Sequence, residues 1–297
     1  MKKASKDTVA VVVTYNRIDL LQECIDALLK CDCDILIIDN ASTDGTQETL
    51  EKKYKDKIIY QNTGANLGGA GGFNYGIKKA YQLGYKYLWI MDDDCIVHED
   101  SLEALKSFGE SKNNDYGFLA SKVLWKDNSI CKMNVPKRTF AKWLKPENVT
   151  EPTEIAMASF VSLFVQAKTI KEFGLPIKDF FIWTDDWEFT RRISRKEKCY
   201  YAPESVVTHK SKSNIGADLA TEEGERMDRF KYLYRNDRVL YRREGLSGFI
   251  LLRLRIAKHL LKILTSGKKD KMKRIKIMFD ALKAGRKYYP EIEHVSK

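Results

Sequence analysis

Short apolar runs alternate with segments of helical periodicity along the first hundred residues. The apolar runs are residues 9–13, 35–38, 58–60 and 87–91. A parallel strand that is buried on both faces carries apolar side chains without interruption, so each run predicts such a strand. Because strands and helices alternate through residue 108, the pattern predicts a doubly wound α/β sheet.

The segments between these runs carry helix signals. Apolar residues recur at helical spacing from Leu20 to Leu29, and Asp19 stands where a helix cap is expected. A polar turn at residues 40–46 leads into a second predicted helix at residues 47–54. A third helix is predicted to end at Gly84, which can adopt the left-handed conformation that often follows a helix.

The rest of the chain divides into an irregular middle and a helical end. Residues 109–180 contain many loop signals, and we interpret this stretch as the acceptor side of the molecule. From Phe230 onward, the apolar residues again follow a helical spacing. We therefore expect two regions, a nucleotide-binding α/β domain at residues 1–224 and a helical region at residues 225–297.

The basic charge of the 297-residue chain is concentrated in the second region. Residues 1–224 hold 31 Lys and Arg against 33 Asp and Glu, a net charge of −2. Residues 225–297 hold 21 against 8, a net charge of +13. A basic end of this kind is typical either of a nucleic-acid-binding arm or of a segment that lies on an anionic membrane surface.

The cysteine pattern and the hydrophobic runs indicate a cytoplasmic protein. Six scattered cysteines form no CxxC pair and have no histidine at zinc-ligand spacing, which argues against a disulfide framework and against structural zinc. Lys2, Lys3 and Lys6 precede a run of only five apolar residues, too short for a signal peptide. The most apolar later stretch, residues 249–264, contains five basic or histidine residues and should not span a bilayer.

Three consecutive aspartates, Asp92, Asp93 and Asp94, follow directly on the apolar run at residues 87–91. Three adjacent carboxylates repel one another, and a divalent cation at a strand end lowers that cost best. Hard oxygen ligands suit Mg²⁺ or Mn²⁺, ions that usually bind the phosphates of a substrate. The alternative is a solvated acidic turn.

Other polar groups follow the predicted strands at the same edge of the sheet. Asp39 ends the second strand, Asp44 lies in the turn after it, and the loop at residues 14–17 follows the first strand. In doubly wound sheets, ligands bind outside the carboxyl ends of the strands. These positions together predict a nucleotide-binding crevice.

The glycine-rich segment at residues 66–74 matches neither of the common phosphate-binding motifs. Ile77 stands where a Walker loop needs Lys, and Asn74 stands where a dinucleotide fingerprint needs Gly. The segment therefore predicts a glycine-rich helix start, at which backbone N–H groups favour an anion. Close packing of the helix on the sheet explains the glycines equally well.

A second acidic group, Asp185 and Asp186, lies between Trp183 and Trp187. Two neighbouring carboxylates beside aromatic rings indicate a desolvated general base next to side chains on which a sugar can stack. The alternative is an ordinary helix start, since Asp185 and Glu188 have the spacing of a capping box. His209 ends another apolar run and is either a structural histidine or a nitrogen ligand that favours Mn²⁺.

Taken together, these residues resemble the family-2 glycosyltransferases of the GT-A fold, in both order and spacing. The resemblance covers residues 8 to about 215, and its glycine-rich and acidic segments look most like the bacterial galactofuranosyltransferase and rhamnosyltransferase branch. Thr184 departs from the galactofuranosyl pattern, in which Trp directly precedes the paired aspartates. The matching pieces are residues 12–17, 38–46, 66–74, 92–94, 185–188 and His209.

The resemblance implies a role for each matching residue. Asp186 corresponds to the catalytic base, and Asp185 would help to hold the acceptor. Asp92 and Asp94 correspond to the DxD pair, which with His209 would bind Mn²⁺ or Mg²⁺, while Asp92 could instead contact the ribose. The residues implied to surround the nucleotide sugar are Thr14, Tyr15, Arg17, Asp39, Asp44, Asn66, Gly68, Asp92, Asp93 and Trp183.

We therefore expect a metal-dependent inverting glycosyltransferase that transfers galactofuranose from UDP-galactofuranose to a lipid-linked glycan for a cell-surface polysaccharide. A rhamnosyltransferase that uses dTDP-rhamnose is the alternative within the family. A sugar-phosphate nucleotidyltransferase lacks support, because no glycine-rich basic loop stands near the N-terminus. A nucleic-acid-binding protein would leave the strand-end aspartates unexplained. We expect no nucleic-acid partner, and we expect peripheral contact with the inner face of the cell membrane through the C-terminal helices. The sequence is compatible with a monomer or a homo-oligomer.

Overall fold

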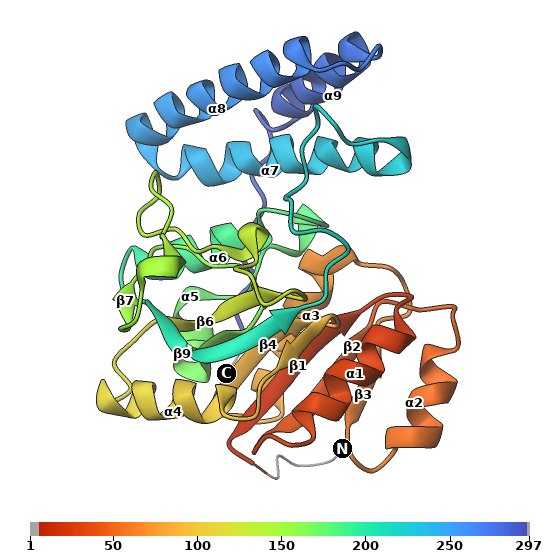
Figure 1. The fold of residues 1–297 in the computed structure, drawn as a ribbon, viewed down its shortest axis with the longest axis vertical. Helices are drawn as coiled ribbons and strands as arrows, with labels where there is room; N and C mark the ends of the chain where they lie inside the picture. Colours follow the sequence, from red (N-terminus) through yellow and green to blue (C-terminus); the bar gives the residue numbers. More distant parts are fainter. Residues whose placement is uncertain (1–5, 296–297) are drawn as a thin grey trace.

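The computed structural model describes residues 6–295, in which a central sheet is covered by helices on both faces and a layer of three helices lies at one end (Figure 1). Lys2 and Lys3, and the outermost residues of the two predicted regions, lie outside the described residues. The described fold confirms the predicted class, a mixed α/β sheet flanked by helices.

Four parallel strands form the half of the sheet that carries the N-terminal motifs. They lie in the order β3-β2-β1-β4, so the first strand of the chain is central and crossover helices connect the others. Continuous apolar runs placed β1, β2 and β4 correctly because both of their faces are buried, whereas the edge strand β3 is only partly buried and ends in two polar residues. Their bounds are β1 Thr8–Thr14, β2 Asp34–Asp39, β3 Ile59–Asn62 and β4 Tyr87–Asp92.

The other half of the sheet contains antiparallel pairs and makes the sheet mixed. Strand β8 pairs antiparallel with both β4 and β6, β9 runs parallel to β6, and β5 and β7 pair antiparallel with β9. The bounds of these strands are β5 Cys95–Val97, β6 Phe118–Trp125, β7 Thr153–Glu154, β8 Leu163–Gln166 and β9 Tyr200–His209.

The irregular middle was therefore only partly predicted. Residues 109–180 do contain long loops, but they also supply β6 and β8, two strands next to the centre of the sheet. Lys122 interrupts the apolar run of β6, and β8 has only four residues. Both strands depend on pairing with distant segments, which local periodicity does not reveal.

Helices cover the sheet in two layers, each with its own apolar core. One core joins the sheet to α1, α2 and α4, and the other joins it to α3, α5 and α6 (Figure 1). The bounds are α1 Ile18–Leu28, α2 Thr46–Tyr54, α3 Gly68–Gln82, α4 Ser101–Ser111, α5 Ala167–Phe173 and α6 Asp185–Ser194.

Two predicted helix ends have different outcomes. Gly84 follows α3 with φ of +87°, which confirms the predicted stop. Asp19 was wrongly predicted as the cap of α1, because the helix begins at Ile18 after Arg17 and places Asp19 in its first turn. There its carboxylate faces the positive end of the helix dipole.

The predicted helical end forms the third layer. Helices α7 (Phe230–Arg242), α8 (Gly245–Thr265) and α9 (Lys271–Ala284) share a small apolar core, and α7 lies between α8 and the sheet domain (Figure 1). Among residues 6–295, no helix is both long enough and apolar enough to cross a membrane.

Candidate active site

The aspartate triplet lies where β4 ends and the chain turns into β5. Strand β5 pairs antiparallel with β9, and this register places Cys95 opposite His209. The backbone N–H of Lys210 also donates to the carbonyl of Asp94 at 2.8 Å. Strand pairing thus brings His209 beside Asp92 and Asp94, and one ligand atom from each of the three lies within 4.8 Å of the others.

These three side chains fit a divalent cation. Oδ1 of Asp94 is buried and accepts no hydrogen bond, although Nε2 of His209 lies 3.0 Å away. Two carboxylates and one imidazole are donors that Mn²⁺ accepts and that Mg²⁺ accepts in part. Asp92, Asp94 and His209 would therefore hold the ion, as the sequence predicted.

Asn134 fixes the orientation of the histidine ring, and the sequence analysis missed it. Nδ1 of His209 donates to Oδ1 of Asn134 at 2.7 Å, while Nδ2 of Asn134 donates to Oγ of Ser159 at 2.9 Å. The thiol of Cys131 donates to the same Oδ1 at 3.0 Å. With Nδ1 donating to Asn134, Nε2 is the ring nitrogen that faces Asp94, and it can bind a metal once its own proton is lost. An Asn in a loop 75 residues before His209 gives no local signal of this role.

The charges in this cluster perturb one another. Burial and the charge of Asp94 raise the pKa of Asp92 to about 7. Burial opposes ionisation of Asp94, but its contacts with His209 and Arg17 outweigh burial and lower its pKa. Burial opposes the charged form of His209 as well, yet Asp94 outweighs it and raises the pKa of His209 to about 10. A metal must therefore displace a proton from His209 when it binds.

Asp93 points toward β1 and away from the ligand cluster. Its carboxylate accepts from Oγ1 of Thr14 at 2.8 Å and from Nη1 of Arg17 at 2.9 Å. The same Nη1 donates to Asp94 at 2.8 Å. Thr14, Arg17 and Asp93, all predicted to contact the nucleotide sugar, thus form a polar cluster that holds the triplet against β1.

The other residues that were predicted to bind the nucleotide lie at or after the ends of neighbouring strands. Asp39 is fully buried and accepts from the hydroxyl of Tyr60 at 2.7 Å. Asp44 accepts from Oγ1 of Thr46 at 2.5 Å and from the backbone N–H of Ile18, so it ties the start of α2 to the start of α1. Tyr15 is exposed. The predicted crevice edge is therefore assembled by contacts between the loops that follow β1 and β2.

The glycine-rich segment forms the start of α3, as predicted, and Gly68, Gly71 and Gly72 allow close packing there, whereas Gly69 faces open space. Asn66 accepts from the N–H of Gly68 at 2.9 Å, and Gly68 has φ of +70°. A Cβ at Gly68 would lie 2.1 Å from the carbonyl oxygen of Phe181. That carbonyl accepts from the N–H of Ala70 at 3.1 Å, so one of the backbone N–H groups at the start of α3 already has a partner within the protein. The packing explanation is thus supported at Gly68.

The second acidic pair lies in the first turn of α6, after a strained loop. Phe181, Trp183 and Thr184 all have positive φ, between 64° and 71°, which is uncommon for residues other than glycine. The helix-start alternative is confirmed, because Asp185, Asp186 and Glu188 lie in the first turn of α6. Only its capping-box detail is wrong, since the cap position is Thr184, which makes no side-chain cap bond. Asp185 begins α6 instead.

Helix α7 holds this loop in place. Nδ2 of Asn236 donates to the carbonyl oxygens of Phe180, Ile182 and Trp183 at 3.0–3.2 Å. Oγ1 of Thr184 donates to Asp237 at 3.1 Å. The positive-φ conformation that precedes the acidic pair therefore depends on two consecutive residues of a helix some 50 positions later.

Both carboxylates of the pair hold protons more tightly than ordinary aspartates. Burial raises the pKa of Asp185 to about 7. Burial, and then the charge of Asp185, raise the pKa of Asp186 well above its ordinary value, and Asp92 adds to the effect. The influence of Asp92 on Asp186 places the second acidic pair within electrostatic reach of the aspartate triplet. A carboxylate with a raised pKa is a stronger base once it is ionised.

The two tryptophans that flank the pair contact different parts of the chain. The Trp183 ring lies 5.0 Å from that of Phe230 in α7, and Trp187 meets the half-exposed Trp143 edge to face at 5.5 Å. The ring of Trp183, which was predicted to contact the nucleotide sugar, thus packs in part against the helical layer.

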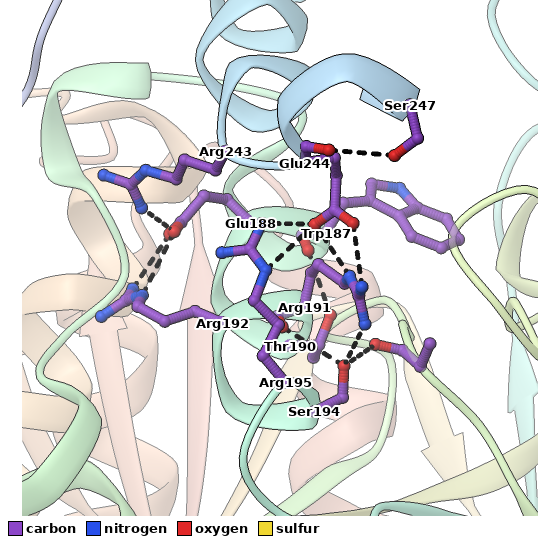
Figure 2. Close-up of polar contacts among 11 residues, drawn as sticks. Trp187, Glu188, Thr190, Arg191, Arg192, Ser194, Arg195, Arg243, Glu244 and Ser247 are labelled. Carbon is purple, nitrogen blue, oxygen red and sulfur yellow. Dashed lines mark hydrogen bonds and ion pairs between the residues drawn. The ribbon is translucent and has the colours of Figure 1, made fainter. Parts of the chain in front are cut away.

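Ion pairs join α6, which carries the second acidic pair, to the corner between α7 and α8, as Figure 2 shows. Glu188, which is 1 % exposed, pairs with Arg243 and with Arg192, the latter at 3.0 Å. Glu244 pairs with Arg195 and with Arg191, the latter at 2.8 Å. The helical layer therefore takes part in positioning α6.

The chain resembles known glycosyltransferases in sequence and in fold. Residues 9–132 match the model of the family described as Glycosyl transferase family 2. The chain is 27% identical over 196 residues to galactofuranosyltransferase GlfT1 of Mycobacterium tuberculosis, which covers 63% of this chain and 64% of that protein. It is 29% identical over 212 residues to the poly(ribitol-phosphate) beta-N-acetylglucosaminyltransferase TarP of Staphylococcus aureus. This match covers 67% of this chain and 60% of TarP.

A shorter match and two solved structures complete the comparison. Abequosyltransferase RfbV of Salmonella typhimurium is 33% identical over 113 residues, 35% of this chain and 33% of that protein. The chain thus spans between one third and two thirds of these relatives. S. aureus TarS 1–349 superposes with a TM-score of 0.57 at 15% identity, covering 93% of this chain and 70% of TarS 1–349. GalNAc-T7 with UDP, GalNAc and Mn²⁺ also gives 0.57 at 15% identity, covering 94% and 56%.

At such identities the solved structures establish the fold alone, while the family model matches residues 9–132 and the sequence relatives are named as glycosyltransferases. The predicted GT-A fold and the predicted enzyme class are both confirmed at this level. Residues 9–132 of the chain carry a glycosyltransferase family 2 domain.

Proposed function

We propose that the protein is a metal-dependent inverting glycosyltransferase that moves galactofuranose from UDP-galactofuranose to a hydroxyl of a lipid-linked glycan. The observation that carries the proposal is the cluster of Asp92, Asp94 and His209 within electrostatic reach of Asp186. A cation site beside a carboxylate with a raised pKa provides both requirements of glycosyl transfer, stabilisation of a leaving diphosphate and removal of a proton.

In this mechanism Asp92, Asp94 and His209 hold Mn²⁺ or Mg²⁺, which when bound supplies positive charge for the departing diphosphate. Asp186 takes the proton from the acceptor hydroxyl, whose oxygen bonds to the anomeric carbon while the bond to the diphosphate breaks. Attack from the opposite face inverts the configuration. General base catalysis of this kind contributes about 10²- to 10⁴-fold. Asp185, one residue before the base, orients the acceptor.

Support for the donor comes from the relatives and neighbours. The match to a galactofuranosyltransferase covers 63% of this chain, and TarS has been solved with UDP and with UDP-GlcNAc. The match to the N-acetylglucosaminyltransferase TarP covers 67% of the chain and favours UDP-GlcNAc as a second candidate donor. Transfer from dTDP-rhamnose stays an alternative, and the proposal includes action at the inner face of the cell membrane through residues 225–297.

A donor screen tests the proposal. Release of the nucleoside diphosphate would be measured from UDP-galactofuranose, UDP-galactopyranose, UDP-GlcNAc and dTDP-rhamnose, with Mn²⁺, with Mg²⁺ and with chelator. We expect release from UDP-galactofuranose that requires the metal. Faster release from another donor would show that the proposed donor sugar is wrong. Full activity in the presence of chelator would show that the reaction needs no metal.

Two variants separate the roles of the carboxylates. Asp186→Asn should keep UDP binding and lose turnover, whereas Asp94→Ala should lose both. Asp115→Asn, at an exposed aspartate far along the chain from both motifs, is the matched control and should behave as the wild type. Normal turnover in Asp186→Asn would exclude that residue as the base.

A further inference from the structure

The outer helix α8 carries a row of exposed apolar side chains. Thirteen large hydrophobic residues are exposed among residues 6–295, and nine of them lie at or after Leu246. Six belong to α8, with exposed fractions between 50% and 76%. We call these six residues the α8 stripe: Leu246, Phe249, Ile250, Leu254, Leu261 and Leu264.

The stripe occupies one side of the helix. At about 100° per residue, its six side chains fall within an arc of roughly 140°. Gly248, Leu252 and Ile263 lie on the other side and are buried against the rest of the helical layer. Figure 1 shows α8 at the outside of this layer, with α7 between it and the sheet domain. The stripe is therefore an unpartnered apolar face and not part of the core.

Two exposed basic residues of α8, Arg253 and Lys258, lie within the stripe and at its border. Residues 245–284 hold eleven Lys and Arg against two Asp, a net charge of +9, and α8 itself has no acidic residue. The guanidinium of Arg253 lies 3.3 Å from the centroid of the Phe249 ring, within the stripe. Lys258 is exposed at its border. An apolar stripe with a cationic border is the pattern of helices that lie in the interface of an anionic membrane.

We propose that the α8 stripe binds the surface of an anionic lipid bilayer, with α8 parallel to the membrane plane. A second copy of the chain fits this surface less well, because two faces of the same positive charge would repel each other. The helix is about 31 Å long, but its four Lys and Arg exclude a transmembrane orientation. The inference rests on the proposed function only for the lipid-linked acceptor.

Contacts connect the stripe-bearing helix to the candidate base. Arg255 of α8 donates to Asp237 at 2.8 Å, and Asp237 in turn accepts from Thr184, the residue before the acidic pair. Asp186 therefore has a fixed relation to α8. A bilayer bound at the stripe would present its lipid-linked acceptors at a constant position relative to α6.

Vesicle co-sedimentation of the full chain tests the proposal. Vesicles of phosphatidylcholine with 25% phosphatidylglycerol would be compared with pure phosphatidylcholine, at low and at high salt. We expect binding to the anionic vesicles that weakens with salt. The double variant Leu254→Ser/Leu261→Ser should bind about tenfold less, whereas the control Leu29→Ser/Ile215→Ser, at exposed apolar residues elsewhere, should bind as the wild type.

Three further measurements make the result decisive. Circular dichroism and thermal melting check that both double variants fold. Light scattering reports the oligomeric state, and an oligomer that the stripe variant dissociates while vesicle binding persists would assign the stripe to a second copy and overturn the proposal. Unchanged vesicle binding in a folded stripe variant would also overturn it. Release of UDP from the donor by hydrolysis, without acceptor, should be equal in all variants. Hydrolysis tests the proposed function and vesicle binding tests the α8 stripe, so the failure of one proposal can be distinguished from the failure of the other.

Discussion

Asn134 accepts a hydrogen bond from Nδ1 of His209 at 2.7 Å, and this single contact determines which ring nitrogen faces Asp94. The asparagine is itself oriented by Ser159, so its amide oxygen stays on the histidine. Such outer contacts raise the basicity of a metal-binding imidazole and fix its direction. Asn134 is thus a positioning residue for the proposed cation.

Removal of this contact should weaken metal binding without unfolding the chain. Asn134→Ala is expected to raise the dissociation constant for Mn²⁺ by about 10- to 100-fold, because the ring of His209 loses its fixed tautomer and direction. Electron paramagnetic resonance of free Mn²⁺ measures the affinity independently of turnover. Asn148→Ala, an exposed asparagine in a nearby loop, is the control. Equal affinity in the two variants would exclude the positioning role.

The pH dependence of transfer should follow the raised pKa of the acidic pair. A base acts only when ionised, and a raised pKa shifts ionisation to higher pH, so activity should rise with pH and be lost on acidification well above pH 4. The relevant range includes pH 7, to which burial raises the pKa of Asp185. A profile of kcat/KM from pH 5 to 9 at saturating Mn²⁺ measures this. A profile that stays flat down to pH 5 would contradict it.

Loss of Asn236 should affect the acceptor side selectively. Asn236→Ala removes the amide donor of the Ile182 and Trp183 carbonyl oxygens, whereas the Phe180 oxygen keeps the N–H of Ile182 and Arg235; the loss should cost about 1–3 kcal/mol of stability. Because that loop leads into Asp185, we expect kcat to fall while the UDP dissociation constant stays unchanged. Denaturant unfolding and calorimetric UDP binding measure the two effects. Lys231→Ala, at an exposed position of the same helix, should change neither.

Glu188 should be essential for the stability of the junction between α6 and the helical layer. Glu188→Ala leaves the guanidinium groups of Arg192 and Arg243 without their carboxylate partner, and breaking a buried ion pair typically costs about 3–5 kcal/mol. Chemical denaturation measures the loss. Glu204→Ala, at an exposed glutamate of β9, should change stability by less than about 0.5 kcal/mol. An equally small loss of stability in Glu188→Ala would contradict the prediction, because it would show that water solvates Arg192 and Arg243 when the carboxylate is absent.

The sequence by itself determined the parallel half of the sheet and the location of the charged motifs. Continuous apolar runs identify strands buried on both faces, and the polar residue that ends each run must lie at the edge of the sheet. Asp39 and Asp92 were placed at that edge for this reason, and the structure confirms both positions. The helical character of the basic end was equally readable, because it depends on local periodicity.

Only the tertiary structure decided which of these groups meet. Asp94 and His209 are 115 residues apart and come together through the pairing of β5 with β9, while Asn134 reaches the histidine from a loop. The strained turn before Asp185 is held by Asn236 and Asp237, from a helix that the sequence predicted to be a separate region. Antiparallel pairing and contacts between distant side chains depend on packing of the whole chain, and local patterns carry no information about them.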